Sequence, residues 1–238
     1  MKKITWLISV LIIGGVAGTL GSLWLAPALA DFWPLSHIDW LKNARNGTTI
    51  INKTERVVVA PDNAFAQGVE KIRPALVGVR SYLGGKLVAE GNGFVLTTDG
   101  LVATSAWLLP DKGNYKIVLG GQEKEAVLLK KDASAALLKI NSENLTPAAF
   151  VEKDNLFLAQ DLLLVYLSGL EPEIVLNRGY LKALDLPELA ADFYPEKQIA
   201  TGAPVINAQG RVVALANVNS QREVFLVDSE VIAGLLSN

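Results

Sequence analysis

The sequence offers few bases that could activate a hydroxyl group for covalent chemistry. The 238 residues include one histidine, His37, and no cysteine. A serine or threonine hydroxyl attacks a carbonyl efficiently only when a base takes its proton, and the usual base is an imidazole. His37 precedes the part of the chain that looks globular, so we expect no imidazole to activate a hydroxyl there. The absence of cysteine also excludes thiolate nucleophiles, disulfides and sulfur-ligated metals.

The sequence gives little support for another catalytic base or for a set of metal or phosphate ligands. A serine–lysine dyad needs a lysine whose pKa is lowered by burial, and neither Lys182 nor Lys197 lies in an apolar run. The acidic residues are scattered along the sequence, as expected of residues on solvated surfaces: Asp111, Glu123, Glu125, Asp132, Glu152, Asp154, Glu171 and Glu173. No glycine-rich phosphate loop follows a strand and opens a helix. We therefore expect no metal site and no cofactor. The net charge of −2, with no basic cluster, argues against nucleic acid as a partner.

The stretch that organises the chain is residues 91–109, GNGFVLTTDGLVATSAWLL. Apolar residues fill both arms, and Thr98, Asp99 and Gly100 supply a turn in which glycine can take a positive φ. This pattern predicts a β-hairpin. Its second arm leads directly to Trp107.

The rest of the chain predicts strands at close spacing. Six are expected in the first half, over residues 76–82, 87–97, 101–106, 115–119, 126–130 and 135–140. Five follow in the second half, over residues 162–167, 175–183, 198–206, 211–218 and 223–227. Short helices are expected over residues 61–72, where Pro74 stops the helix, and over residues 228–236. Two antiparallel β-barrels in series, an all-β fold, account for this pattern.

Several segments resemble the protease domain of the HtrA/Deg family of trypsin-like serine proteases. The hairpin resembles the one that delivers the catalytic histidine of that family. Other similar segments are residues 64–79, the DASAALLKI run at 132–140, residues 155–167, TGAPV at 201–205 with Asn207 and Gly210 after it, and the terminal FLVDSEVIAGLL. The resemblance covers residues 62–238 and implies a trypsin-like double β-barrel with no PDZ domain after it.

The same resemblance assigns the catalytic positions, and all of them are substituted. Trp107 takes the position of the histidine, Ser134 that of the aspartate and Thr201 that of the serine. Asp132 could reach the acid position after a local shift, but an acid has no role without an imidazole to orient. Ile199 replaces the glycine of the oxyanion turn, and a β-branched residue resists positive φ, so we expect an ordinary loop conformation there. The resemblance implies a pseudoprotease.

Trp107 has two interpretations. Its indole either fills an abandoned cleft and stabilises the domain, or stands exposed in the old groove as an anchor for a partner. We expect a domain that binds a protein or an extended peptide, or that serves as a scaffold subunit of an envelope assembly. The alternative is a weakly active endopeptidase that uses Thr201 with a non-histidine base or a base supplied by a partner.

The N-terminal segment predicts a membrane anchor. Residues 4–30 carry no charge, follow Lys2 and Lys3, and are long enough to cross the ~30 Å hydrocarbon core as a helix. A cleaved signal peptide that ends in the ALA at 28–30 is the competing interpretation. If the anchor is retained, residues 1–30 form it, residues 31–61 are a juxtamembrane tether, and residues 62–238 are a periplasmic domain held at the inner membrane. Gly14 and Gly18 also allow a homo-oligomer through this segment.

Overall fold

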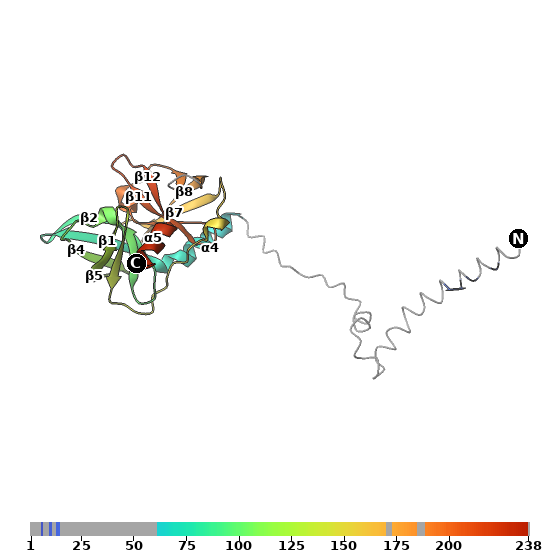
Figure 1. The fold of residues 1–238 in the computed structure, drawn as a ribbon, viewed down its shortest axis with the longest axis horizontal. Helices are drawn as coiled ribbons and strands as arrows, with labels where there is room; N and C mark the ends of the chain where they lie inside the picture. Colours follow the sequence, from blue (N-terminus) through green and yellow to red (C-terminus); the bar gives the residue numbers. More distant parts are fainter. Residues whose placement is uncertain are drawn as a thin grey trace, which may run out of the picture. The chain divides into compact units, whose positions relative to one another are not determined.

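The structure is a computed structural model that describes residues 61–169, 173–184 and 189–237, together with Trp6, Val10, Ile13 and Gly14. The chain divides into two compact units, Met1–Val58 and Val59–Asn238. All the strands among the described residues lie in the second unit (Figure 1).

The expected inner-membrane location is corrected by the structure. A membrane span needs one continuous apolar helix of about 20 residues. In the part of the chain that the structure describes, no helix has that length and apolarity. Most of residues 1–60, including His37 and Gly18, lie outside the described residues.

The described domain opens with a helix and a closed barrel. Helix α4 spans Pro61–Ile72, and a 3-10 turn, η3, spans Arg73–Ala75. Pro74 ends the helix as expected, and Val69 and Ile72 are buried on one face. The barrel has the order β1-β2-β3-β6-β5-β4, with β1 Leu76–Leu83, β2 Lys86–Val95, β3 Leu101–Ser105, β4 Asn114–Leu119, β5 Gln122–Lys131 and β6 Ala135–Ile140. The six strands expected in the first half are confirmed.

The hairpin that organises the sequence is also confirmed. Strands β2 and β3 pair in antiparallel fashion from Gly93↔Thr104 to Val95↔Val102. Gly100 has a φ of 99°, a value at which a side chain would be strained, and its N–H donates to the carbonyl of Thr97. The second arm ends at Ser105, one residue short of the expected end.

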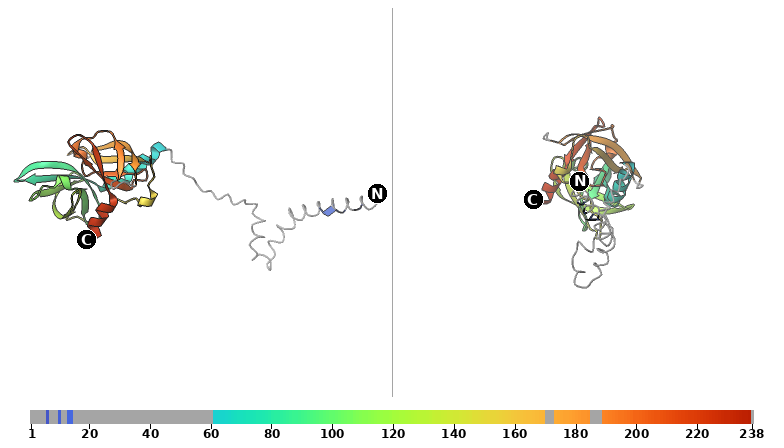
Figure 2. Two further views of the ribbon diagram at one scale, coloured as in Figure 1. Left: turned by 45° about the horizontal axis from the view of Figure 1, so that its top comes forward. Right: turned by 90° about the vertical axis from the view of Figure 1, so that its right-hand side faces the viewer.

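The second half forms a six-stranded sheet of order β12-β11-β10-β7-β8-β9. Its strands are β7 Asp161–Leu167, β8 Ile174–Ala183, β9 Ala190–Phe193, β10 Pro204–Ile206, β11 Val212–Val218 and β12 Val224–Asp228. The end strands β12 and β9 approach each other, so the sheet curls into a second barrel (Figure 2). The expected strand over residues 198–206 is wrong in its first half. Residues Gln198–Ala200 form a 3-10 turn, η6, and only Pro204–Ile206 is a strand.

The buried apolar residues form two clusters. One contains Phe94, Ile117 and Leu138 of the first barrel and continues onto strands of the second barrel, and the other contains Leu162, Leu164 and Val213 of the second barrel. Helix α5, Ser229–Ser237, closes the domain and contacts both β6 and β11. The loops that meet between the two barrels carry the candidate site.

The hairpin turn gives a pH-dependent prediction. Lys139 Nζ donates to Asp99 Oδ2 at 2.5 Å, and this bond, helped by the Thr97 hydroxyl, lowers the pKa of Asp99 to about 2. A carboxylate with a lowered pKa stabilises the fold above its unfolded-state pKa near 3.8, and this stabilisation is lost as pH falls towards 2. We expect Asp99→Asn to show a shallower decline in unfolding free energy between pH 4 and pH 2 than the unsubstituted chain. Urea unfolding at several pH values checks this; parallel declines would contradict it.

Candidate functional site

Trp107 is carried by a short turn at the end of the hairpin. The 3-10 helix η4, Ala106–Leu108, follows β3 directly, and the Ser105 hydroxyl accepts from the Trp107 N–H at 3.0 Å. The side chain of Trp107 is 50% exposed. Its ring lies 6.4 Å from that of Phe225 on β12, in a tilted pair. Two aromatic residues from different barrels thus form one exposed surface.

Ser134 lies in the turn before β6 and is bonded to the η4 turn that carries Trp107. Its carbonyl accepts from the Ala106 N–H at 3.2 Å and from Asn217 Nδ2 at 3.1 Å. Asp132 Oδ1 accepts from the N–H groups of Ser134 and Ala135, both at 2.7 Å. The carboxylate of Asp132 is therefore used to cap this turn.

Thr201 is buried, with 4% of its surface exposed. Its hydroxyl accepts from the Val218 N–H at 3.2 Å and lies 3.4 Å from the Val218 carbonyl. Its own N–H donates to the Gln198 carbonyl at 2.9 Å, which closes the η6 turn. The hydroxyl and the N–H of Thr201 are therefore both bonded to backbone groups.

Trp107 and Thr201 line the same cleft, which has a volume of about 510 Å³. Its wall is completed by residues 88–90 of β2, residues 218–220 at the end of β11, Leu108 of η4 and Gln198 of η6. Ser134 does not line the cleft; its carbonyl bonds Ala106, which precedes Trp107, and Asn217, which precedes the Val218 that bonds Thr201. The structure therefore brings two of the three expected positions to one cleft and leaves the third outside its lining.

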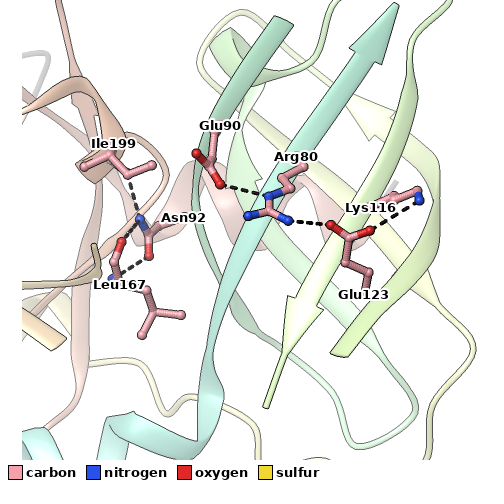
Figure 3. A network of polar contacts seen from close by, with 7 residues as sticks. All are labelled: Arg80, Glu90, Asn92, Lys116, Glu123, Leu167 and Ile199. Atoms are coloured by element: carbon pink, nitrogen blue, oxygen red, sulfur yellow. Dashed lines mark hydrogen bonds and ion pairs between the residues drawn. The ribbon is translucent and has the colours of Figure 1, made fainter. Parts of the chain in front are cut away.

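Asn92 joins this loop to the first barrel, and sequence reasoning missed it (Figure 3). Its N–H donates to the Thr201 carbonyl at 2.8 Å. Its side-chain Nδ2 donates to the carbonyls of Ile199 at 2.7 Å and Leu167 at 3.2 Å, and Oδ1 accepts from the Leu167 N–H at 2.8 Å. An asparagine between two glycines inside a strand was the available signal. The residue is fully buried and holds the two barrels together.

A chain of ion pairs neutralises the β2 side of the cleft (Figure 3). The buried Arg80 guanidinium donates to Glu90 at 2.8 Å and also to Glu123. Lys116 reaches the same Glu123 at 3.3 Å. The hydrogen bond from Arg80 lowers the pKa of Glu123, with Lys116 adding to the effect. Glu90 therefore faces the cleft as one end of a paired network.

Comparison with known proteins identifies the domain. The family model of the trypsin-like peptidase domain matches residues 91–215, just over half of the chain. The chain belongs to the trypsin-like peptidase family. Serine protease HTRA1A of Danio rerio is 27% identical over 175 residues, and serine protease HTRA1B of the same fish is 26% identical over 172 residues. Each match covers 64% of this chain and 36% of the relative, so the chain spans about a third of the length of these curated relatives. The expected resemblance to the HtrA proteases is confirmed at the level of the peptidase domain.

The trypsin-like mechanism needs backbone N–H groups that are free to bind an oxyanion, including that of the nucleophile. In this chain, the N–H of Thr201 is taken by Gln198. Ile199 lies within η6, has no positive φ, and gives its carbonyl to Asn92. The loop thus has an ordinary turn conformation, with its groups committed to internal bonds.

The trypsin-like mechanism also needs a base. Residues 61–238 contain no histidine. Lys182 is half-exposed and pairs with Asp192 at 3.4 Å, and Lys197 is exposed. Neither lysine is buried. Among the described residues, no three His, Asp or Glu side chains gather where they could hold a metal.

Proposed function

We propose that this trypsin-like domain is catalytically inactive and binds a polypeptide segment in the cleft between its barrels. The observation that carries the proposal is the cleft beside Thr201, open to solvent at Trp107 while the groups that would do chemistry are already bonded. Trp107, Ser134 and Thr201 are, on this view, the remains of a catalytic triad, and Ile199 the remains of an oxyanion turn.

Three features support the absence of catalysis. No imidazole is available in residues 61–238 to take a proton from Thr201. The Thr201 hydroxyl is engaged with the backbone of Val218, and its N–H with Gln198. A reaction would require all of these bonds to be replaced before the hydroxyl could attack.

Two features support binding. A volume of about 510 Å³ is in the range of specific ligand clefts. Its rim carries Trp107, and Phe225 lies beside that ring with 44% of its surface exposed. Exposed tryptophan is the residue type most often found at the energetic centre of protein interfaces. The partner class that fits is therefore a protein or peptide.

The test combines reactivity and binding on the full chain. We expect no labelling by a fluorophosphonate probe and no cleavage of unfolded, carboxymethylated casein. We expect the same casein, carrying a fluorophore, to bind, and Trp107→Ala to weaken this binding by at least about tenfold. Leu129→Ser, on the exposed face of β5 and away from the cleft, is the matched control and should leave binding unchanged.

Two results would overturn the proposal. Labelling that disappears in Thr201→Ala would show that the domain has found another base, as in a weakly active peptidase. Binding that is equal in Trp107→Ala and the unsubstituted chain would remove the cleft as the binding site.

A further inference from the structure

The hairpin that joins β1 to β2 ends in an exposed apolar tip. Residues 83–88, LGGKLV, are all exposed to solvent. Leu83 and Leu87 are 47% and 50% exposed. Leu83 opposes Lys86, and Tyr82 opposes Leu87, so the two leucine side chains point to opposite faces of the hairpin. Both faces of the tip are therefore open, and the rest of the described domain covers neither of them.

The turn at this tip stands clear of the barrel. Gly84 and Gly85 have φ values of 57° and 81°, and a Cβ at either position would meet no atom within 4 Å. Such a tip is convex, so it offers no pocket that could hold the side chain of a partner. Its exposed leucines are instead suited to enter a soft apolar layer.

Two exposed lysines flank the tip. Lys86 lies in the hairpin itself, and Lys112 lies in the loop before β4, whose first residue opposes Tyr82. Neither lysine forms an ion pair with another described residue. The acidic residue of the same loop, Asp111, lies 3.4 Å from Lys131, which offsets its charge. The apolar side chains of the tip are thus surrounded by positive charge.

Charge is divided unequally between the two halves of the domain. Residues 61–140, which include the first barrel, have ten basic and eight acidic side chains. Residues 141–238, which include the second barrel, have six basic and thirteen acidic ones. An anionic surface would attract the first half and repel the second. Because the tip belongs to the first barrel, this asymmetry turns it towards such a surface.

We propose that the β1–β2 tip inserts into the surface of a lipid bilayer that contains anionic headgroups. Leu83 and Leu87 enter the boundary between the headgroups and the acyl chains, while Lys86 and Lys112 stay at the depth of the phosphates. The contact is weak and reversible, since it has few apolar side chains and few charges. It goes beyond the proposed function and does not depend on it, because the cleft takes a polypeptide and the tip takes lipid.

The test uses the full chain, which has no cysteine of its own. Gly84→Cys introduces one thiol, which carries the environment-sensitive fluorophore NBD. Gly120→Cys is the matched control, because Gly120 has the same φ of 57° and no atom within 4 Å of a Cβ. Its turn, between β4 and β5, lies at the opposite end of the β1–β4 pairing.

The labelled chains are mixed with vesicles of equal parts phosphatidylglycerol and phosphatidylcholine. We expect NBD emission at position 84 to rise at least about twofold and to move to shorter wavelength, with no change at position 120. The fluorophore reports only its own surroundings, so contact of another part of the chain with the vesicles does not produce this result.

Double variants of the chain labelled at position 84 test the side chains: Leu83→Ser with Leu87→Ser, and Lys86→Gln with Lys112→Gln. We expect each to need at least about fivefold more lipid for half of the emission change. Lys71→Gln with Lys197→Gln removes the same charge at exposed positions elsewhere and should leave the lipid requirement unchanged. Urea unfolding checks that all the variants are folded.

Each outcome decides a part of the proposal. No emission change at position 84, or equal changes at positions 84 and 120, would overturn it. An equal response to vesicles of phosphatidylcholine alone would remove the role of the anionic headgroups. A response at position 84 to carboxymethylated casein, with none to vesicles, would make the tip a protein contact and contradict insertion into lipid. The proposed function is decided separately, by casein binding that depends on Trp107.

Discussion

Replacing Gly202 by alanine is expected to lower the unfolding free energy by about 3 to 5 kcal/mol, or to prevent folding. Gly202 has a φ of 85°, a conformation that residues with a Cβ rarely adopt. A Cβ at this position would lie 2.0 Å from the Asn92 carbonyl oxygen and 2.8 Å from the Thr104 hydroxyl. These two groups are hydrogen-bonded to each other, so neither can move alone without breaking this bond between β2 and β3. Urea unfolding measures the loss.

Gly85→Ala is the matched control for this substitution. Gly85 has nearly the same φ, 81°, but no atom lies within 4 Å of the position that a Cβ would take there. Its substitution should cost only the backbone strain, about 1 to 2 kcal/mol. The difference between the two variants isolates the steric contact at Gly202. Equal losses would show that the loop around Thr201 is not packed against Asn92 as the structure has it.

The hairpin could be predicted because its information is local. Apolar arms and the Thr98 to Gly100 turn lie within one short stretch, and the turn residue takes the positive φ that its sequence favours. The helix before Pro74 follows from equally local signals. Elements of this kind need no partner to be recognised.

The segment around Thr201 could not be predicted in the same way. Residues 198–206, QIATGAPVI, were expected to form one strand, yet η6 occupies the first three of them. The turn is stabilised from outside, by Asn92 on the first barrel and by Ala216, whose carbonyl accepts from the Gly202 N–H at 2.7 Å. Strand β9, Ala190–Phe193, was missed because its four residues show no apolar alternation and it is defined by pairing with β8.

The same distinction between local and long-range information applies to the candidate site. Trp107, Ser134 and Thr201 could be named from sequence because each sits in a short segment similar to the HtrA proteases. The structure adds what they contact: Phe225 for the indole, and the Val218 backbone for the hydroxyl.

Asn92→Ala is the second substitution from which we expect a large effect, a loss of about 2 to 4 kcal/mol in unfolding free energy. The alanine keeps the backbone bond to Thr201 but removes three side-chain bonds, to the carbonyls of Ile199 and Leu167 and from the Leu167 N–H. These groups lie between the barrels, so some of them would be left without a partner where water has little access. Urea unfolding again measures the loss.

The same substitution should loosen the loop that carries Thr201. Hydrogen exchange of amides 199–202 is expected to accelerate more than that of amides in the β1–β2 pairing, because the Ile199 carbonyl loses its bond to the first barrel. Asn114→Ala, at an exposed position of β4, is the control and should change stability by less than about 0.5 kcal/mol. If Asn92→Ala were as mild as Asn114→Ala, the two barrels would not depend on this amide. The η6 turn would then be held by its own hydrogen bond, from the Thr201 N–H to the Gln198 carbonyl.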